Sequence, residues 1–110
     1  MVFFDWNSAS ITADGARLLD NVVRVYPHFG NHRIEMLGTA DRSGGEAYNL
    51  RLSQRRIEAV KRYLQERGVP PSAFGRSDAR GESLSLVETD DGVREPQNRF
   101  VTIGLVPAPD

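Results

Sequence analysis

The chain has 110 residues, of which 39% are apolar and 26% are charged, a size and composition that suit one compact domain with one hydrophobic core. Its 14 basic and 15 acidic residues give a net charge of −1, which argues against nucleic acid as a partner, because such proteins usually carry a basic surplus. The sequence has no cysteine, which excludes disulfides and zinc–thiolate sites. Thirteen of the 14 basic residues are arginine, an excess that we interpret mainly as a coding bias.

Apolar periodicity predicts six elements, with strands and helices alternating over most of the chain. The predicted strands cover residues 2–4, 33–38, 73–80 and 100–105, and the predicted helices cover residues 13–26 and about 46–67. Ser10 or Thr12 is expected to cap the first helix, Pro27 ends it, and Gly68 ends the second helix. The alternation favours crossover connections and a sheet that is at least partly parallel.

Two segments fit no regular element. Residues 81–97 are polar and acidic and are long for a plain loop, so we expect either a short helix or a mobile stretch there. The tail from residue 107 is expected to fray. No apolar run approaches the ~20 residues that cross a bilayer, and Met1 leads into an apolar segment without the charged start of a signal peptide. If the protein is exported, we expect this chain to be a mature or excised domain.

Arg56 lies on the apolar face of the second predicted helix. At the angular spacing of an α-helix it projects between Leu52, Val60 and Tyr63, and Asn49 falls on the same stripe. Because burying a charge without a partner is costly, the guanidinium must either reach solvent past the edge of the core or meet a carboxylate. That carboxylate belongs either to this chain or to a ligand.

Asp41 follows the second predicted strand and precedes the N-terminus of the long helix. On its own it is interpreted as a turn or capping residue. Together with Asn49, Arg56 and the first N–H groups of the helix, however, it forms a set that suits a zwitterion such as an amino-acid head group, because a carboxylate binds an ammonium and a guanidinium binds a carboxylate. Arg99 lies on the inward side of the last predicted strand, as either a further ligand contact or a rim residue that covers apolar surface.

The sequence carries no recognisable catalytic motif. It has neither a Gly-x-Ser-x-Gly elbow nor a Gly-x-x-x-x-Gly-Lys phosphate loop. His28 and His32 are separated by a turn-forming glycine, so no metal pair is expected, and Asp41 with Glu82 or Asp78 gives only a weak signal for hydrolysis. We therefore expect a binding domain rather than an enzyme, with no cofactor and no metal.

A resemblance to a known family rests on three motifs: Gly38-Thr39-Ala40-Asp41-Arg42-Ser43-Gly44, Tyr48-Asn49 and Leu52-Ser53-Gln54-Arg55-Arg56. Their spacing closely resembles the core motif of OmpA-like C-terminal peptidoglycan-binding domains, whose relatives include the peptidoglycan-associated lipoprotein and flagellar stator proteins. The resemblance extends over nearly the whole chain, with further matches at Val2 to Ala9, Gly68-Val69-Pro70, Gly81-Glu82 and Asn98-Arg99-Phe100-Val101. It implies an α+β fold of βαβαββ order with the helices packed on a mixed four-stranded sheet, a domain over residues 1–106 and a frayed tail over 107–110.

The resemblance also implies a function, which is non-covalent binding of the diaminopimelate residue of the peptidoglycan stem peptide. Such binding anchors the outer membrane or a membrane complex to the cell wall. The family's motif Asp and Arg, which hold the zwitterionic end of diaminopimelate, correspond to Asp41 and Arg56. The implied binding residues are Asp41, Arg56, Asn49, Arg99, Arg42 and Thr39. The implied location is the periplasm, as the C-terminal domain of an outer-membrane or other envelope protein.

Several alternatives stay open at this stage. One alternative is that this chain is a periplasmic protein–protein assembly module of the same fold with weak or no peptidoglycan binding, which the polar segment 81–97 suggests. A homodimer and periplasmic protein partners are compatible with the sequence, whereas membrane contact is expected only through a parent segment absent from this chain. The sequence also departs from the family motif. Thr39-Ala40 replaces the common His/Tyr-Thr pair, and Phe100 replaces the second closing Arg, on the face opposite Arg99 by strand parity.

Overall fold

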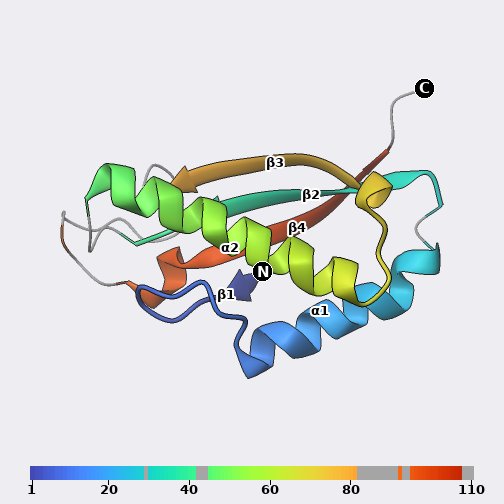
Figure 1. The fold of residues 1–110 in the computed structure, drawn as a ribbon, viewed down its shortest axis with the longest axis horizontal. Helices are drawn as coiled ribbons and strands as arrows, with labels where there is room; N and C mark the ends of the chain where they lie inside the picture. Colours follow the sequence, from blue (N-terminus) through green and yellow to red (C-terminus); the bar gives the residue numbers. More distant parts are fainter. Residues whose placement is uncertain (29, 42–44, 82–91, 93–94, 108–110) are drawn as a thin grey trace.

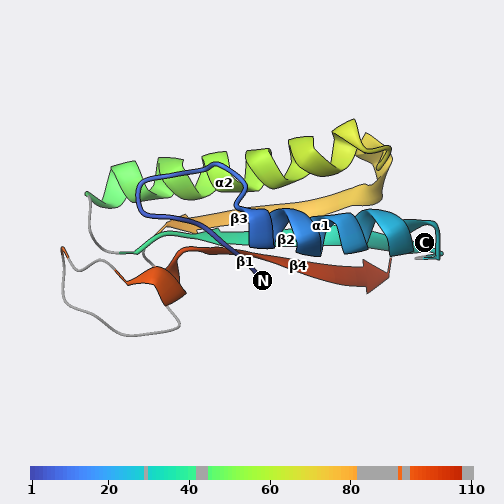
Figure 2. The ribbon, with the colours of Figure 1, turned by 90° about the horizontal axis from the view of Figure 1, so that it is seen from below.

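A computed structural model describes residues 1–28, 30–41, 45–81, 92 and 95–107 of the chain. Two helices pack on one face of a four-stranded sheet (Figures 1 and 2), which confirms the predicted α+β class. The strands are β1 (Val2–Phe3), β2 (His32–Thr39), β3 (Phe74–Gly81) and β4 (Phe100–Pro107), and the α-helices are α1 (Ala13–Val25) and α2 (Glu46–Glu66). Three short 3₁₀ helices are η1 (Tyr26–His28), η2 (Pro71–Ala73) and η3 (Pro96–Asn98).

The sheet has the strand order β1-β4-β2-β3. Strands β2 and β3 are parallel, as expected for two strands joined by the crossover helix α2, whereas β4 runs antiparallel to both β1 and β2. The prediction of a partly parallel sheet is therefore confirmed. Strand β4 enters the sheet between the first two strands of the chain, so residues from both ends of the sequence lie side by side.

Helix α1 begins directly after Thr12, the second of the two predicted capping residues. The Thr12 hydroxyl accepts a hydrogen bond from the Gly15 N–H at 3.0 Å, which satisfies one of the unpaired donors of the first turn. The helix ends at Val25, and η1, which contains Pro27, follows it. Fully buried Leu19 fixes the face that α1 presents to the sheet.

Two glycines leave room for helix α2 against the sheet. A Cβ on Gly38 of β2 would lie 2.8 Å from the Ser53 carbonyl oxygen, and a Cβ on Gly81 at the end of β3 would lie 2.9 Å from the Leu50 nitrogen. Gly81 also has a φ of +56°, a conformation that favours glycine. The Ser53 hydroxyl accepts a 3.0 Å hydrogen bond from the Gly81 N–H and so joins α2 to the strand end.

The main core lies between this face of the sheet and the two helices. Its buried members come from every strand except β3 and from both α-helices: Val2, Phe4, Leu19, Ile34, Met36, Ile57, Val60, Leu64, Val69, Ala73 and Val101. Burying these side chains removes apolar surface from water, which is the dominant favourable term in folding. The predicted apolar arc of the long helix is thus confirmed at Ile57, Val60 and Leu64.

The structure bears on two segments for which no regular element was predicted, the C-terminal tail and the polar segment 81–97. Strand β4 extends to Pro107, paired with His32, so the first residue of the expected tail belongs to the sheet. Residues 108–110 lie outside the described part of the chain, and the domain boundary stays a prediction. Most of the polar segment 81–97 also lies outside it. The described end of that segment belongs to η3, and the expectation of either a short helix or a mobile stretch for the rest stays a prediction.

Candidate functional site

Arg56 is the largest of the fully buried side chains, with only 1% of its surface exposed. Its Nε donates to the Ser8 carbonyl at 2.8 Å, Nη1 to the Thr39 carbonyl at 3.0 Å, and Nη2 to the Asp5 carbonyl at 3.1 Å. Sequence reasoning offered two alternatives for Arg56, exit to solvent or contact with a carboxylate of this chain or of a ligand. The exit to solvent is wrong, because Arg56 is buried, and its three direct hydrogen bonds go to backbone carbonyls. Contact with a ligand carboxylate stays a prediction. The guanidinium clamps the loop between β1 and α1 to the end of β2, because its rigid fork can serve three acceptors at once.

The electrostatic surroundings keep Arg56 charged at neutral pH. Burial lowers the pKa of Arg56 to about 10, the negative charge of Asp41 opposes that shift, and the positive charge of Arg99 adds to it. The guanidinium carbon also lies 5.2 Å from the centre of the Phe4 ring, a cation–π geometry. Arg56 therefore remains a cation inside the fold, held by carbonyl dipoles, an aromatic face and a nearby carboxylate.

Asp41 and Arg99 form a buried ion pair beside this cation. Arg99 Nε donates to Asp41 Oδ2 at 2.6 Å, and the Asp41 and Arg99 side chains are only 5% and 10% exposed. The same carboxylate oxygen accepts the Glu95 N–H at 3.1 Å. Asp41 thus joins the end of β2 to the chain that leads into β4. The expected closeness of Arg99 to the core rim is confirmed, but sequence reasoning did not identify Asp41 as its partner.

The remaining predicted site residues have different surroundings. The Thr39 hydroxyl is fully buried, donates to the Asn98 carbonyl at 2.9 Å and accepts the Phe100 N–H at 3.2 Å, so it joins β2 to β4. Asn49 is buried in the first turns of α2, on the same side of the helix as Arg56. Arg42 lies outside the described residues, so its role stays a prediction.

The structure therefore brings four of the predicted residues together at one end of the sheet, including Thr39, whose carbonyl accepts a hydrogen bond from Arg56. Asp41 contacts Arg99, and both charges act on Arg56. Sequence reasoning missed the carbonyls of Asp5 and Ser8 and the N–H of Glu95. Every residue carries these backbone groups, so no sequence pattern marks them. Only the resemblance of residues 2–9 to a family turn indicated that this loop mattered.

Phe100 lies away from the charged cluster, as strand parity predicts. Its ring packs edge-on against Phe3, with the ring centres 6.2 Å apart, whereas Arg99 turns toward Asp41. The departure from a second closing arginine therefore leaves the ion pair intact. Within the described residues, no three His, Cys, Asp or Glu side chains are placed to share a metal ion. In the same part of the chain, no helix has the length and apolar character to cross a membrane.

Comparison with known proteins identifies the family. The sequence model of the OmpA family matches residues 3–99. The chain belongs to the OmpA family. It is 39% identical over 111 residues to an outer membrane protein of Gluconacetobacter diazotrophicus, covering 96% of this chain and 29% of that protein. It is 37% identical over 98 residues to the peptidoglycan-associated lipoprotein of Rhizobium meliloti, covering 89% of this chain and 55% of that protein. This OmpA-family chain thus spans 29% and 55% of the lengths of these two relatives.

Solved structures share the fold of this OmpA-family chain. The peptidoglycan-associated lipoprotein of Burkholderia pseudomallei superposes with a TM-score of 0.81 at 27% identity, covering 96% of this chain and 88% of that one. The C-terminal domain of Helicobacter pylori MotB gives the same TM-score at 18% identity, covering 96% and 82% of the two chains. Two helices packed on a mixed four-stranded sheet are therefore a shared architecture.

Proposed function

We propose that this OmpA-family domain binds peptidoglycan non-covalently, through the diaminopimelate residue of the stem peptide, and so anchors a membrane or membrane complex to the cell wall. The domain acts in the periplasm, as part of an outer-membrane or other envelope protein. Its similarity to peptidoglycan-associated lipoproteins supports the polymer. The choice of residue within the polymer rests on the chemistry of the site.

The observation that carries this proposal is the gathering of one carboxylate and two guanidinium groups, all buried, at one end of the sheet. The free end of diaminopimelate bears an ammonium and a carboxylate on the same carbon. In our proposal Asp41 binds the ammonium, and Arg56 and Arg99 attract the carboxylate, because charge-assisted hydrogen bonds are about twice as strong as neutral ones. Asn49, Arg42 and Thr39 complete the proposed set of site residues.

Arg56 keeps some hydrogen-bonding capacity for this task. A guanidinium has five N–H donors, and the three carbonyl contacts use one donor on each nitrogen. One N–H on Nη1 and one N–H on Nη2 are therefore not used by the three carbonyl contacts. The clamp also fixes the orientation of the guanidinium before a ligand arrives, which lowers the entropy cost of binding.

The test is calorimetric titration of a stem tetrapeptide that contains diaminopimelate, compared with the same peptide containing lysine, which lacks the second carboxylate. We expect the wild-type domain to prefer the diaminopimelate peptide. Asp41→Asn keeps an acceptor for Arg99 but removes the charge that binds ammonium. Loss of one hydrogen bond to a charged group costs about 1.5–3 kcal/mol, so the affinity should fall roughly tenfold to a hundredfold.

The chain offers a matched control for this variant. Asp78 and Arg80 also form a carboxylate–guanidinium pair, at 2.9 Å, but on the outer surface of β3. Asp78→Asn should leave the affinity unchanged. A folded Asp41→Asn variant that binds as tightly as wild type would refute the assignment of the ammonium site. Failure of wild type to bind either peptide or purified sacculi would favour the protein–protein assembly alternative, and release of soluble muropeptides from the sacculi would contradict a purely binding role.

A further inference from the structure

Thr39 stands where the family motif commonly has a histidine or a tyrosine, and the charges of the site do not explain this substitution. Thr39 is the last residue of β2, and none of its surface is exposed. Its hydroxyl accepts the Phe100 N–H at 3.2 Å and donates to the Asn98 carbonyl at 2.9 Å. A buried hydroxyl that takes part in two hydrogen bonds is itself held in one orientation and fixes the groups that it contacts.

The two partners of the Thr39 hydroxyl flank Arg99 in the sequence. The regular pairing of β2 with β4 reaches only to Gly38 and Val101, one residue short of Thr39. Beyond that point the Thr39 side chain continues the connection between the two strands, on both sides of Arg99. From the other neighbouring strand, the Phe4 N–H donates to the Arg99 carbonyl at 2.8 Å. Three hydrogen bonds therefore hold the backbone around Arg99, and two of them depend on one hydroxyl.

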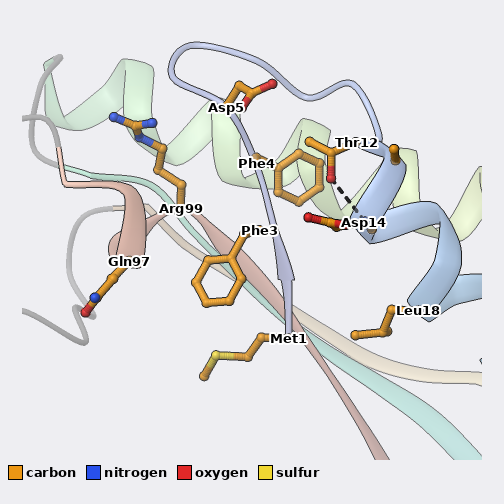
Figure 3. Close-up of a pocket in the computed structure, with 11 residues that line it drawn as sticks. Met1, Phe3, Phe4, Asp5, Thr12, Asp14, Leu18, Gln97 and Arg99 are labelled. Carbon is orange, nitrogen blue, oxygen red and sulfur yellow. Dashed lines mark hydrogen bonds between the residues drawn. The ribbon is translucent and has the colours of Figure 1, made fainter.

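The position of this backbone decides where the Arg99 guanidinium lies. Figure 3 shows the side chain leaving the start of β4 toward the side on which Asp5 lies, whereas Gln97 points the opposite way. In this orientation Arg99 Nε reaches Asp41 Oδ2 at 2.6 Å. An arginine side chain has many rotamers, so a fixed backbone limits the number of orientations that compete with the one facing Asp41.

Thr39 also contacts the second guanidinium of the site, but through its backbone. The Thr39 carbonyl accepts the Arg56 Nη1 hydrogen bond at 3.0 Å. Any residue at this position has that carbonyl, whereas only serine and threonine carry a hydroxyl on Cβ. A substitution of Thr39 can therefore remove the support of Arg99 and keep the acceptor for Arg56.

We propose that Thr39 is a positioning residue, whose hydroxyl holds the start of β4 so that Arg99 is oriented beside Asp41 before a ligand binds. In this role Thr39 acts through Arg99 and does not itself contact the stem peptide. The effect on binding rests on the proposed function, whereas the orientation of Arg99 is measurable without a ligand. Because apparent affinity falls with the fraction of molecules in the binding-competent state, a less ordered Arg99 weakens binding.

The test is Thr39→Val, which keeps the branched shape but leaves the Phe100 N–H and the Asn98 carbonyl without the hydroxyl. Two-dimensional proton–nitrogen NMR of the ligand-free domain follows the Arg99 Nε–H signal, which is assigned by its loss in Arg99→Gln. We expect Thr39→Val to shift and broaden this signal. Its affinity for the diaminopimelate tetrapeptide should fall about fivefold to tenfold, measured at a temperature where each variant is fully folded. Thr39→Ser keeps the hydroxyl and should restore both the signal and the affinity.

Two further variants make the result specific. Thr102→Val makes the same change elsewhere on β4, at a partly exposed residue opposite Leu37, and should alter neither measurement. Thr39→Ala also lacks the hydroxyl and takes the place of Thr39→Val if the second methyl group prevents folding.

An unchanged Arg99 signal in a folded variant without the hydroxyl would overturn the positioning role, even if the unfolding midpoint falls. Lower affinity with that unchanged signal would overturn it in favour of direct contact between Thr39 and the ligand. If wild type binds no peptide, the proposed function fails, and the Arg99 signal of Thr39→Val alone then decides whether the hydroxyl holds this arginine.

Discussion

Replacing Arg56 by Met tests whether the hydrogen bonds of the buried guanidinium stabilise the folded domain, in addition to the binding role proposed for Arg56. Methionine keeps an unbranched side chain of similar length against Phe4 but removes all three hydrogen bonds. The carbonyls of Asp5, Ser8 and Thr39 then lose their donor, and the Thr39 carbonyl lies at a fully buried residue. We expect the free energy of unfolding to fall, because buried acceptors without a partner are costly.

The magnitude follows from these contacts. A hydrogen bond from a charged donor contributes about 1.5–3 kcal/mol, but two of the three acceptors are only partly buried and water can replace the donor there. We therefore expect Arg56→Met to destabilise the domain by about 3–5 kcal/mol, a large share of the roughly 5–15 kcal/mol of a typical domain. Arg56→Lys keeps the charge but reaches fewer carbonyls, so about 2–3 kcal/mol should be lost.

Equilibrium urea unfolding, followed by circular dichroism and tryptophan fluorescence, measures these differences from the shift in midpoint at constant slope. Arg55 is the matched control, because it is the preceding residue on α2 but is exposed, over the ring of Tyr48. Arg55→Met should change stability by less than about 0.5 kcal/mol. The clamp is refuted if Arg56→Met and Arg55→Met unfold at the same urea concentration.

Two more predictions concern the packing of α2. Gly81→Ala should destabilise the domain by about 1–3 kcal/mol in the same urea assay, because alanine disfavours the positive φ and its Cβ would lie 2.9 Å from the Leu50 nitrogen. Gly30 is the control, because it also has a positive φ but open space around it, so Gly30→Ala should lower the free energy of unfolding by less. The Tyr63 hydroxyl donates to Asp20 at 2.6 Å, which raises the pKa of Tyr63. Ultraviolet titration should therefore show Tyr63 ionising above the usual pH for tyrosine, and Asp20→Asn should lower that pH; an unchanged titration would contradict the hydrogen bond.

The helical arc of residues 46–67 shows how far the sequence alone could lead. Periodicity identified the helix within a residue or two of α2 and placed Arg56 among apolar neighbours, because the repeat of 3.6 residues is local information. The same reasoning left exit to solvent or a carboxylate, of this chain or of a ligand, as alternatives for Arg56. The structure contradicts the exit to solvent, and the ligand carboxylate stays a prediction. The three partners are backbone carbonyls from two distant segments, and their position depends on the tertiary fold.

The charged pair illustrates the same limit. Strand parity put Arg99 on the inward face, and the motif marked Asp41, but nothing local indicated that the two residues, separated by 58 positions, form one ion pair. Their meeting depends on β4 entering the sheet next to β2. The pocket lined by Phe3, Leu18 and Arg99 was not predicted either, since it depends on how the edge of β1 faces the start of α1.

The pairing of Val2 with Val101 has a consequence for the order of folding. Contacts between residues far apart in sequence form late, because closing the long loop between them costs entropy. Strand β1 has no neighbour in the sheet until β4 is present, and the loop that Arg56 clamps begins directly after β1. A chain that lacks β4 should therefore leave β1 without a strand partner and the Asp5 and Ser8 carbonyls without a fixed position for the Arg56 guanidinium. Formation of this end of the domain thus depends on a contact between the two ends of the described sheet, Val2 and Val101.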